Sequence, residues 1–172
     1  MQEEIINKVA NSGLITIDLE ELYPKGERVV FDIKPLLFHE LILKEKDFRE
    51  HIKQRDWTQY KDAYVALTCT ADAIVPTWAY MLLAIALEPY TRKVVFGNME
   101  TLEVILFHEA LTSIRYSDYK DKRVVIKGCG NLPVTTHAYV ELTRGLKPFA
   151  KSIMYGEPCS TVPLYKAPAV KG

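Results

Sequence analysis

Three cysteines are the residues of this chain whose side chains are best suited to bind a metal or to act as nucleophiles. Cys69 and Cys129 each follow a short apolar run and precede a helical pattern, and Cys159 lies in the segment "GEPCSTVPLYK". In open α/β sheets, ligands bind beyond the carboxyl ends of the strands, so Cys69 and Cys129 are expected at that edge. Because thiolates suit zinc and iron–sulfur clusters, the three cysteines together predict a metal site.

A closed tetrahedral metal site needs a fourth ligand. The candidates are His137, in the helical pattern after Cys129, and Asp72, three residues after Cys69, with a water molecule or a partner group as further alternatives. The intervals between the cysteines match no zinc-ribbon or ferredoxin pattern, so this hypothesis depends on the fold. Zinc and an iron–sulfur cluster both remain open as the cofactor.

Two other functions remain open, and a non-enzymatic role is favoured over an enzymatic one. A thiol-based sulfur-transfer or redox protein would use one reactive cysteine, with Cys129 preferred because glycines flank it and allow access. A non-catalytic interaction domain would instead dock its apolar tail "STVPLYKAPAV" on another subunit. Each cysteine could also be an inert buried residue, because reduced cysteine behaves as a small hydrophobe.

Several common catalytic and nucleotide-binding motifs are absent from the sequence. It contains no P-loop, no nucleophile elbow and no Cys-x-x-Cys pair, and "GCGNLP" has Pro133 where a dinucleotide loop needs its last glycine. The segments "HELI" and "HEAL" lack the second histidine of the zinc-protease motif. His39, His51 and His108 are therefore interpreted as structural or solvated residues.

The elements that must position the cysteines alternate along the chain. Strands are predicted near residues 64–69, 93–97 and 123–128, and helices near 76–90, 99–114 and 134–145. This order predicts an α/β fold, with a three-layer arrangement around a core of parallel strands. If the order of the strands in the sheet follows the chain, the middle strand separates the two cysteine-bearing strands; if the first strand is central, these two are neighbours.

The remaining segments complete a single predicted domain over residues 1–172. Strands at 14–19 and 28–33 and a helix within 44–60 form an N-terminal extension of the core, and a short helix is expected from Pro148 to Gly156. Gly145 is expected to cap the helix before it. The segments "YVALTCTADAIVPTWAY" and "RVVIKGCGNLPVTTHAY" share the order strand, cysteine, proline, Ala-Tyr, but two copies are too few to predict a repeat architecture.

Charge and hydropathy exclude several classes of partner. Lys and Arg together number 22, as do Asp and Glu, so no net charge favours nucleic acid or an anionic membrane. The longest nearly apolar stretch, from Ile74 to Leu87, is shorter than the roughly 20 residues that span a bilayer. Because "MQEEIINKVA" lacks the features of a signal peptide, a cytoplasmic protein with reduced cysteines is expected. The oligomeric state stays open.

Long segments of the chain resemble a bacterial family known as domain of unknown function 2480. The similar segments include "RDWTQYKDAYVALTCTADAIVPTWAYMLLA", "SIMYGEPCSTVPLYK", "VVFDIKPLLFHELILKEKDFREHI" and "GCGNLP", and the resemblance covers nearly the whole chain. No activity is established for this family, so the resemblance implies no catalytic residue. Its association with gene neighbourhoods for iron–sulfur cluster assembly implies that iron–sulfur assembly proteins are the partners. It also implies an accessory or carrier role in cluster assembly.

Overall fold

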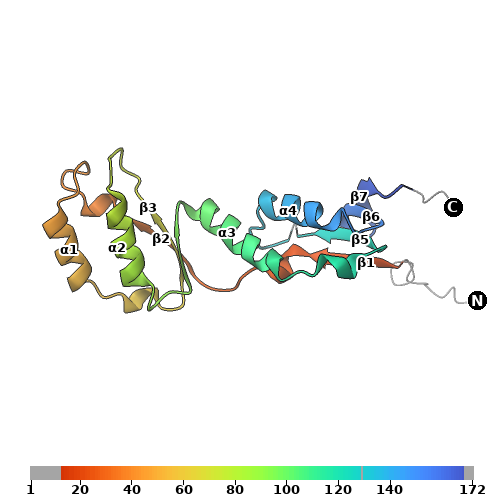
Figure 1. Cartoon of the computed structure of the whole chain (residues 1–172), viewed down its shortest axis with the longest axis horizontal. Helices are drawn as coiled ribbons and strands as arrows, with labels where there is room; N and C mark the ends of the chain where they lie inside the picture. Colours follow the sequence, from red (N-terminus) through yellow and green to blue (C-terminus); the bar gives the residue numbers. More distant parts are fainter. Residues whose placement is uncertain (1–12, 129, 169–172) are drawn as a thin grey trace, which may run out of the picture. The chain divides into compact units, whose positions relative to one another are not determined.

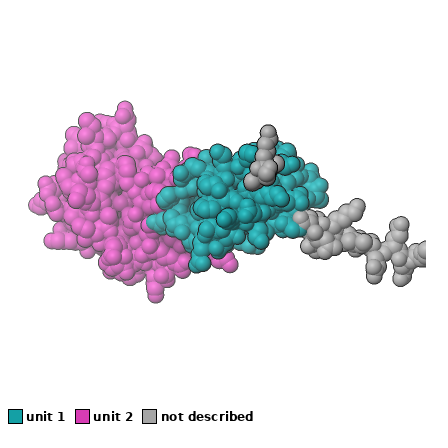
Figure 2. Space-filling view, turned by 45° about the vertical axis from the view of Figure 1, so that its right-hand side comes forward, with its two compact units in different colours: residues 1–24, 106–172 teal, residues 25–105 magenta. Residues whose placement is uncertain are grey.

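The computed structural model describes residues 13–128 and 130–168 and divides the chain into two compact units. Unit 1 comprises Met1–Pro24 and Leu106–Gly172, and unit 2 comprises Lys25–Ile105 (Figure 2). In the described residues, helices alternate with strands that are mostly parallel, which confirms the predicted α/β class. Over the same residues, no helix combines the length and apolar composition needed to cross a membrane.

Unit 2 contains a three-stranded parallel sheet in the order β2-β3-β4. Its elements follow the chain as β2 (Arg28–Asp32), η2 (Lys34–Leu36), α1 (Glu45–Gln54), η3 (Thr58–Tyr60), β3 (Tyr64–Thr68), α2 (Thr77–Leu87) and β4 (Lys93–Phe96) (Figure 1). The strands are rich in valine and aromatic residues, which favour the extended backbone. Each crossover between parallel strands passes through a helix, as parallel pairing requires.

The core of unit 2 lies between this sheet and helices α1 and α2. Val65 and Leu67 are two residues apart on β3, so their side chains point to the same face of the sheet. Both belong to one buried cluster with Phe48 of α1 and Leu83 of α2. The two helices therefore cover the same face. Ala66, which points to the opposite face, is also fully buried.

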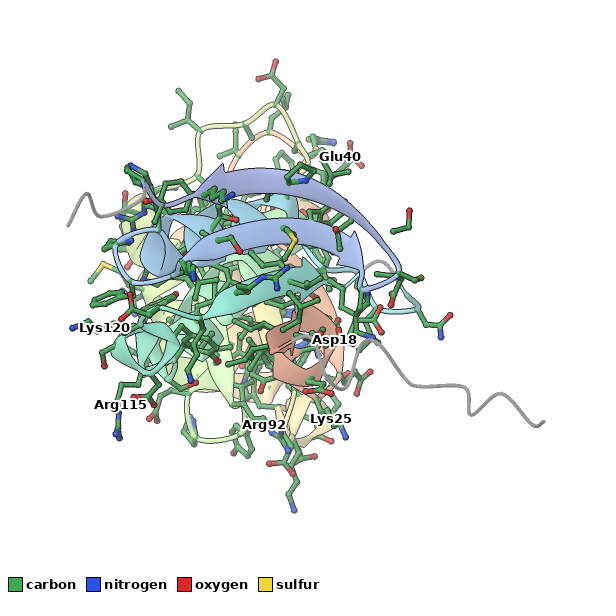
Figure 3. All side chains as sticks on the ribbon, turned by 90° about the vertical axis from the view of Figure 1, so that its right-hand side faces the viewer. Asp18, Lys25, Glu40, Arg92, Arg115 and Lys120 are labelled. Carbon is green, nitrogen blue, oxygen red and sulfur yellow. The ribbon has the colours of Figure 1, made fainter. Side chains whose placement is uncertain are left out.

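Unit 1 contains a four-stranded sheet in the order β1-β5-β6-β7 (Figure 3). Its elements are β1 (Leu14–Asp18), η1 (Leu19–Leu22), η4 (Tyr116–Tyr119), β5 (Arg123–Lys127), α4 (Thr136–Leu146), β6 (Ser152–Glu157) and β7 (Ser160–Lys166), together with the later part of α3 (Met99–Thr112). The first three strands are parallel, and β7 pairs antiparallel with β6. Val124 and Ile126 of β5 form one buried cluster with Phe107 of α3 and Leu142 of α4.

The two units repeat the same pattern, with a shift of 59 residues between them. The sequence Tyr60-Lys61-Asp62 returns as Tyr119-Lys120-Asp121, and both aspartates adopt a left-handed backbone with φ of 59° before a strand begins. The pairing register obeys the same shift, because Tyr64 lies opposite Lys93 and Arg123 lies opposite Ser152. The similarity noted in the sequence is therefore a structural duplication of a strand–helix–strand unit.

The structure corrects the predicted arrangement of strands. The strands near 64–69 and 93–97 share one sheet, but the strand near 123–128 belongs to the other sheet, so neither predicted strand order holds. The predicted strands at 14–19 and 28–33 are not an extension. They are β1 and β2. β1 pairs in parallel with β5, and β2 pairs in parallel with β3.

Two further predictions for the C-terminal region were wrong. The segment expected to form a helix from Pro148 to Gly156 contains the turn after α4 and most of β6, because β7 supplies an antiparallel partner along its length. Gly145 does not cap α4 but lies inside it, where a Cβ atom would come within 2.4 Å of the Tyr116 ring. The missing side chain thus makes room for Tyr116.

Candidate functional site

Helix α4 places a histidine and a glutamate on one face. The helix begins after Thr135, whose side-chain oxygen accepts a hydrogen bond from the backbone N–H of Ala138 at 3.3 Å. His137 and Glu141 are four residues apart, a spacing that brings side chains together on a helix. The Nε2 atom of His137 lies 2.8 Å from Oε2 of Glu141.

Helix α3 supplies a third polar group to this cluster. Nδ1 of His108 lies 2.9 Å from Oε1 and 3.0 Å from Oε2 of Glu141. His108 immediately follows Phe107, which belongs to the buried cluster that also holds Ala138 and Leu142 of α4. Because these neighbours are packed together in the core, the two helices bring both histidines to the same carboxylate.

The electrostatics of the cluster keep Glu141 ionised. The hydrogen bond from His108 has the largest effect and lowers the pKa of Glu141. Burial raises this pKa by a smaller amount. The charge of His108, the hydrogen bond from His137 and the charge of His137 lower it further. Burial, followed by the nearby charge of Glu141, raises the pKa of Tyr116, so this phenol stays neutral beside the carboxylate.

The three residues offer donor atoms that suit a metal ion. One ligand atom from each of His108, His137 and Glu141 lies within 4.8 Å of the others. A tetrahedral zinc ion with bonds of roughly 2.1 Å holds its ligand atoms about 3.4 Å apart, so small side-chain rotations bring the three to binding distance. Two imidazoles and one carboxylate form the donor set of open zinc sites and of non-haem iron(II) sites.

The duplication shows what stands at the equivalent positions of unit 2. The positions equivalent to His108, His137 and Glu141 in unit 2 are Arg49, Trp78 and Leu82. There the Arg49 guanidinium lies over the Trp78 ring, 5.5 Å from its centroid. The equivalent helix–helix junction thus carries a cation–π contact in one unit and a cluster of two histidines and a glutamate in the other.

Cys69 lies at the predicted edge of a sheet, directly after β3. Its side chain is half-buried, and its thiol donates to the backbone carbonyl of Ala71 at 3.7 Å. Burial, and then the nearby acidic groups of Cys69 and Asp32, raise the pKa of Tyr80. Cys69 thus shares the carboxyl end of the unit 2 sheet with a carboxylate and a phenol.

The other predicted ligands do not join Cys69 in a described cluster. Cys159 is exposed in the turn between β6 and β7 of unit 1, Asp72 is exposed in the loop between β3 and α2 of unit 2, and Cys129 lies outside the described residues. Within residues 13–128 and 130–168, the one group of three potential metal ligands contains His137 but neither described cysteine nor Asp72. The three-cysteine site stays a prediction.

Sequence reasoning selected His137 but missed its partners. His108 was interpreted as structural or solvated, and Glu141 was not considered. The four-residue spacing of His137 and Glu141 was a visible signal on a predicted helix. The shift of 59 residues was a second signal, because it sets His137 and Glu141 against Trp78 and Leu82 at equivalent positions.

The fold and this cluster define an α/β protein built from two similar units, one of which carries a candidate metal centre. The chain belongs to the family described as "Protein of unknown function (DUF2480)", whose model matches residues 3–167. This match confirms the resemblance seen in the sequence. Comparisons with curated proteins and with solved structures find no match.

Proposed function

We propose that this protein is a metal-binding accessory protein that holds an exchangeable divalent metal ion at His108, His137 and Glu141. The observation that carries the proposal is the convergence of three donor atoms within 4.8 Å from two different helices. Imidazole and carboxylate donors together suit zinc and ferrous iron. Three protein ligands leave coordination positions for water or for a group on a recipient.

The exposure of the cluster favours exchange over permanent binding. The side chains of His108 and His137 are 56% and 42% exposed, whereas Glu141, between them, is 15% exposed. A recipient can therefore reach the ion from solvent while Glu141 stays fixed by both helices. Because imidazole nitrogens and carboxylates bind a metal only without their protons, affinity is expected to fall in acid.

The test is a titration of metal-free protein with Co²⁺, followed by visible absorption, and with Zn²⁺, followed by calorimetry. The site variants are His108→Asn combined with His137→Asn, and Glu141→Gln alone. His39→Asn is the matched control, because His39 is exposed and asparagine tolerates its positive φ of 51°. We expect one ion per chain, and a loss of affinity of about tenfold or more in the site variants but not in the control.

A triple Cys→Ser variant at Cys69, Cys129 and Cys159 separates this site from the three-cysteine alternative. The proposed site predicts unchanged Co²⁺ affinity in this variant. Metal binding that is lost with the cysteines and retained without the histidines would overturn the proposal and support the thiol site. A wild-type protein that binds neither metal would overturn the proposal and also a zinc site at the cysteines.

A further inference from the structure

We propose that a groove along α4 in unit 1 binds a single-chain anionic amphiphile, a molecule with an apolar chain and a carboxylate or similar head group. This inference is independent of the metal site. The groove has a volume of about 800 Å³, within the range of ligand-binding pockets. Its lining comes from α4, β5, β6 and β7: Ile126, Thr136, Tyr139, Val140, Thr143, Arg144, Lys147, Ile153, Tyr155, Leu164 and Tyr165.

The walls of the groove suit an apolar chain. Ile126 and Ile153 form its base on the sheet, while Val140 and Leu164 are 61% and 51% exposed beside it. The ring of Tyr139 meets the ring of Tyr155 edge to face, with centroids 5.7 Å apart. A chain lying between these surfaces would remove exposed apolar area from water, which is the main source of affinity for such a ligand.

The head group is assigned from the charges at the groove. Arg144 and Lys147 are three residues apart on the end of α4, so they lie on one side of the helix, and no acidic residue lines the groove. Among the described residues neither cation forms an ion pair, and the Lys147 ammonium lies 5.9 Å from the centroid of the Tyr165 ring. Glu141 precedes Arg144 by one turn, but its carboxylate accepts hydrogen bonds from His108 and His137.

Unit 2 provides an equivalent groove without these cations. It has a volume of about 660 Å³, and most of its lining positions correspond under the 59-residue shift, with Met81 for Val140 and Phe96 for Tyr155. The residues equivalent to Arg144 and Lys147 are Ile85 and Glu88. The two grooves thus share apolar walls, whereas their charges differ and predict an anionic ligand for the groove of unit 1 only.

The first experiment measures head-group preference on metal-free, full-length protein by calorimetry. Decanoate, 1-decanol and decyltrimethylammonium share a chain length and differ in charge. We expect decanoate to bind at least tenfold more tightly than the other two. We expect Arg144→Gln combined with Lys147→Gln to reduce decanoate affinity to that of decanol. Equal affinity for the three probes, or no binding of decanoate, would overturn the proposal.

The second experiment locates the ligand with a matched pair of variants. Val140 and Met81 are equivalent positions, each 61% exposed, so glutamate can replace either without entering the core. We expect Val140→Glu to abolish decanoate binding, because its carboxylate repels the head group, and Met81→Glu to preserve it; the opposite result would place the ligand in unit 2 and overturn the proposal. A third measurement tests whether the protein sediments with phosphatidylglycerol vesicles. Sedimentation of a protein that does not bind free decanoate would overturn the proposal in favour of binding to a membrane surface.

Discussion

Units 1 and 2 share their buried helix positions and differ at the exposed ones. Ala79 and Leu83 of α2 are fully buried, and so are their counterparts Ala138 and Leu142 of α4. One residue before each alanine, by contrast, unit 2 has a half-buried tryptophan and unit 1 has His137. Each helix must fit its own sheet, so the inward positions are constrained, whereas the junction between neighbouring helices can be closed by more than one chemistry.

Unit 1 also carries an element that unit 2 lacks. After Gly156 the chain turns back as β7 and pairs with β6, whereas after the equivalent Gly97 the chain enters α3. Leu164 and Tyr165 of β7 add a wall to the groove of unit 1. The candidate metal cluster, the cationic groove and the additional strand thus all lie in unit 1, so we expect the function to depend on unit 1 more than on unit 2.

The largest expected effect tests whether the two cores are equally important. Phe48 and Phe107 occupy equivalent positions and are 1% and 0% exposed. Phe48→Ala and Phe107→Ala should each reduce the free energy of unfolding by about 3–5 kcal/mol, because each leaves a cavity. Denaturant unfolding measures the loss, with the exposed Phe96→Ala as the control. A loss below about 1 kcal/mol in only one variant would show that the cores are not equivalent.

The paired glycines give the next largest effect. Gly97 and Gly156 have φ of 141° and 116°, and a Cβ atom would approach Thr101 to 2.7 Å in the first case and the Ser160 carbonyl oxygen to 2.8 Å in the second. Each Gly→Ala variant should lose about 1–3 kcal/mol of stability through backbone strain and close contact. Thermal unfolding measures the loss. The control is Gly13→Asn, because no atom lies within 4 Å of a Cβ atom at this position and asparagine tolerates a positive φ. We expect only a small change in its stability. A loss as large as in the two Gly→Ala variants would argue against strain and close contact as the cause.

The helix caps sharpen the comparison. Thr135 caps α4 through its side chain, whereas the equivalent Pro76 offers α2 no side-chain hydrogen bond. Thr135→Ala should therefore cost about 1 kcal/mol, and Thr135→Ser should restore most of it. Chemical denaturation monitored by circular dichroism measures both changes. Equal stability of the alanine and serine variants would contradict a capping role.

The smallest expected effect concerns pH. Because the pKa of Glu141 is lowered in the folded protein, this carboxylate stabilises the fold above its unfolded-state pKa of about 4.3, and the stabilisation is lost as the pH falls through the lowered value. Glu141→Gln should therefore be less stable than the wild type near pH 6, and the two should converge in acid. Urea unfolding across this range measures the difference. A difference that does not shrink in acid would show that the charge of Glu141 is not its source.

Local patterns predicted the elements on which both units depend. The strands near 64–69, 93–97 and 123–128 form within one or two residues of their predicted limits, because short β-branched runs favour the extended backbone. The helix predicted from 76 to 90 is present as α2 (Thr77–Leu87), with Pro76 at its N-cap and not within its first turn. The segment after Pro148 was missed because β6 forms by pairing with β5 and β7, and pairing partners are not encoded by local periodicity.

A spacing of four residues places His137 and Glu141 on one face of a helix wherever that helix packs, so this pair is visible in the sequence. His108 lies 29 residues before His137 on a different helix, and it meets the same carboxylate only in the folded chain. Phe107 and Leu142 are buried in one cluster, and their burial brings the polar residues beside them into contact. The placement of β3 and β5 in separate sheets likewise depends on contacts between distant segments, which local patterns do not encode.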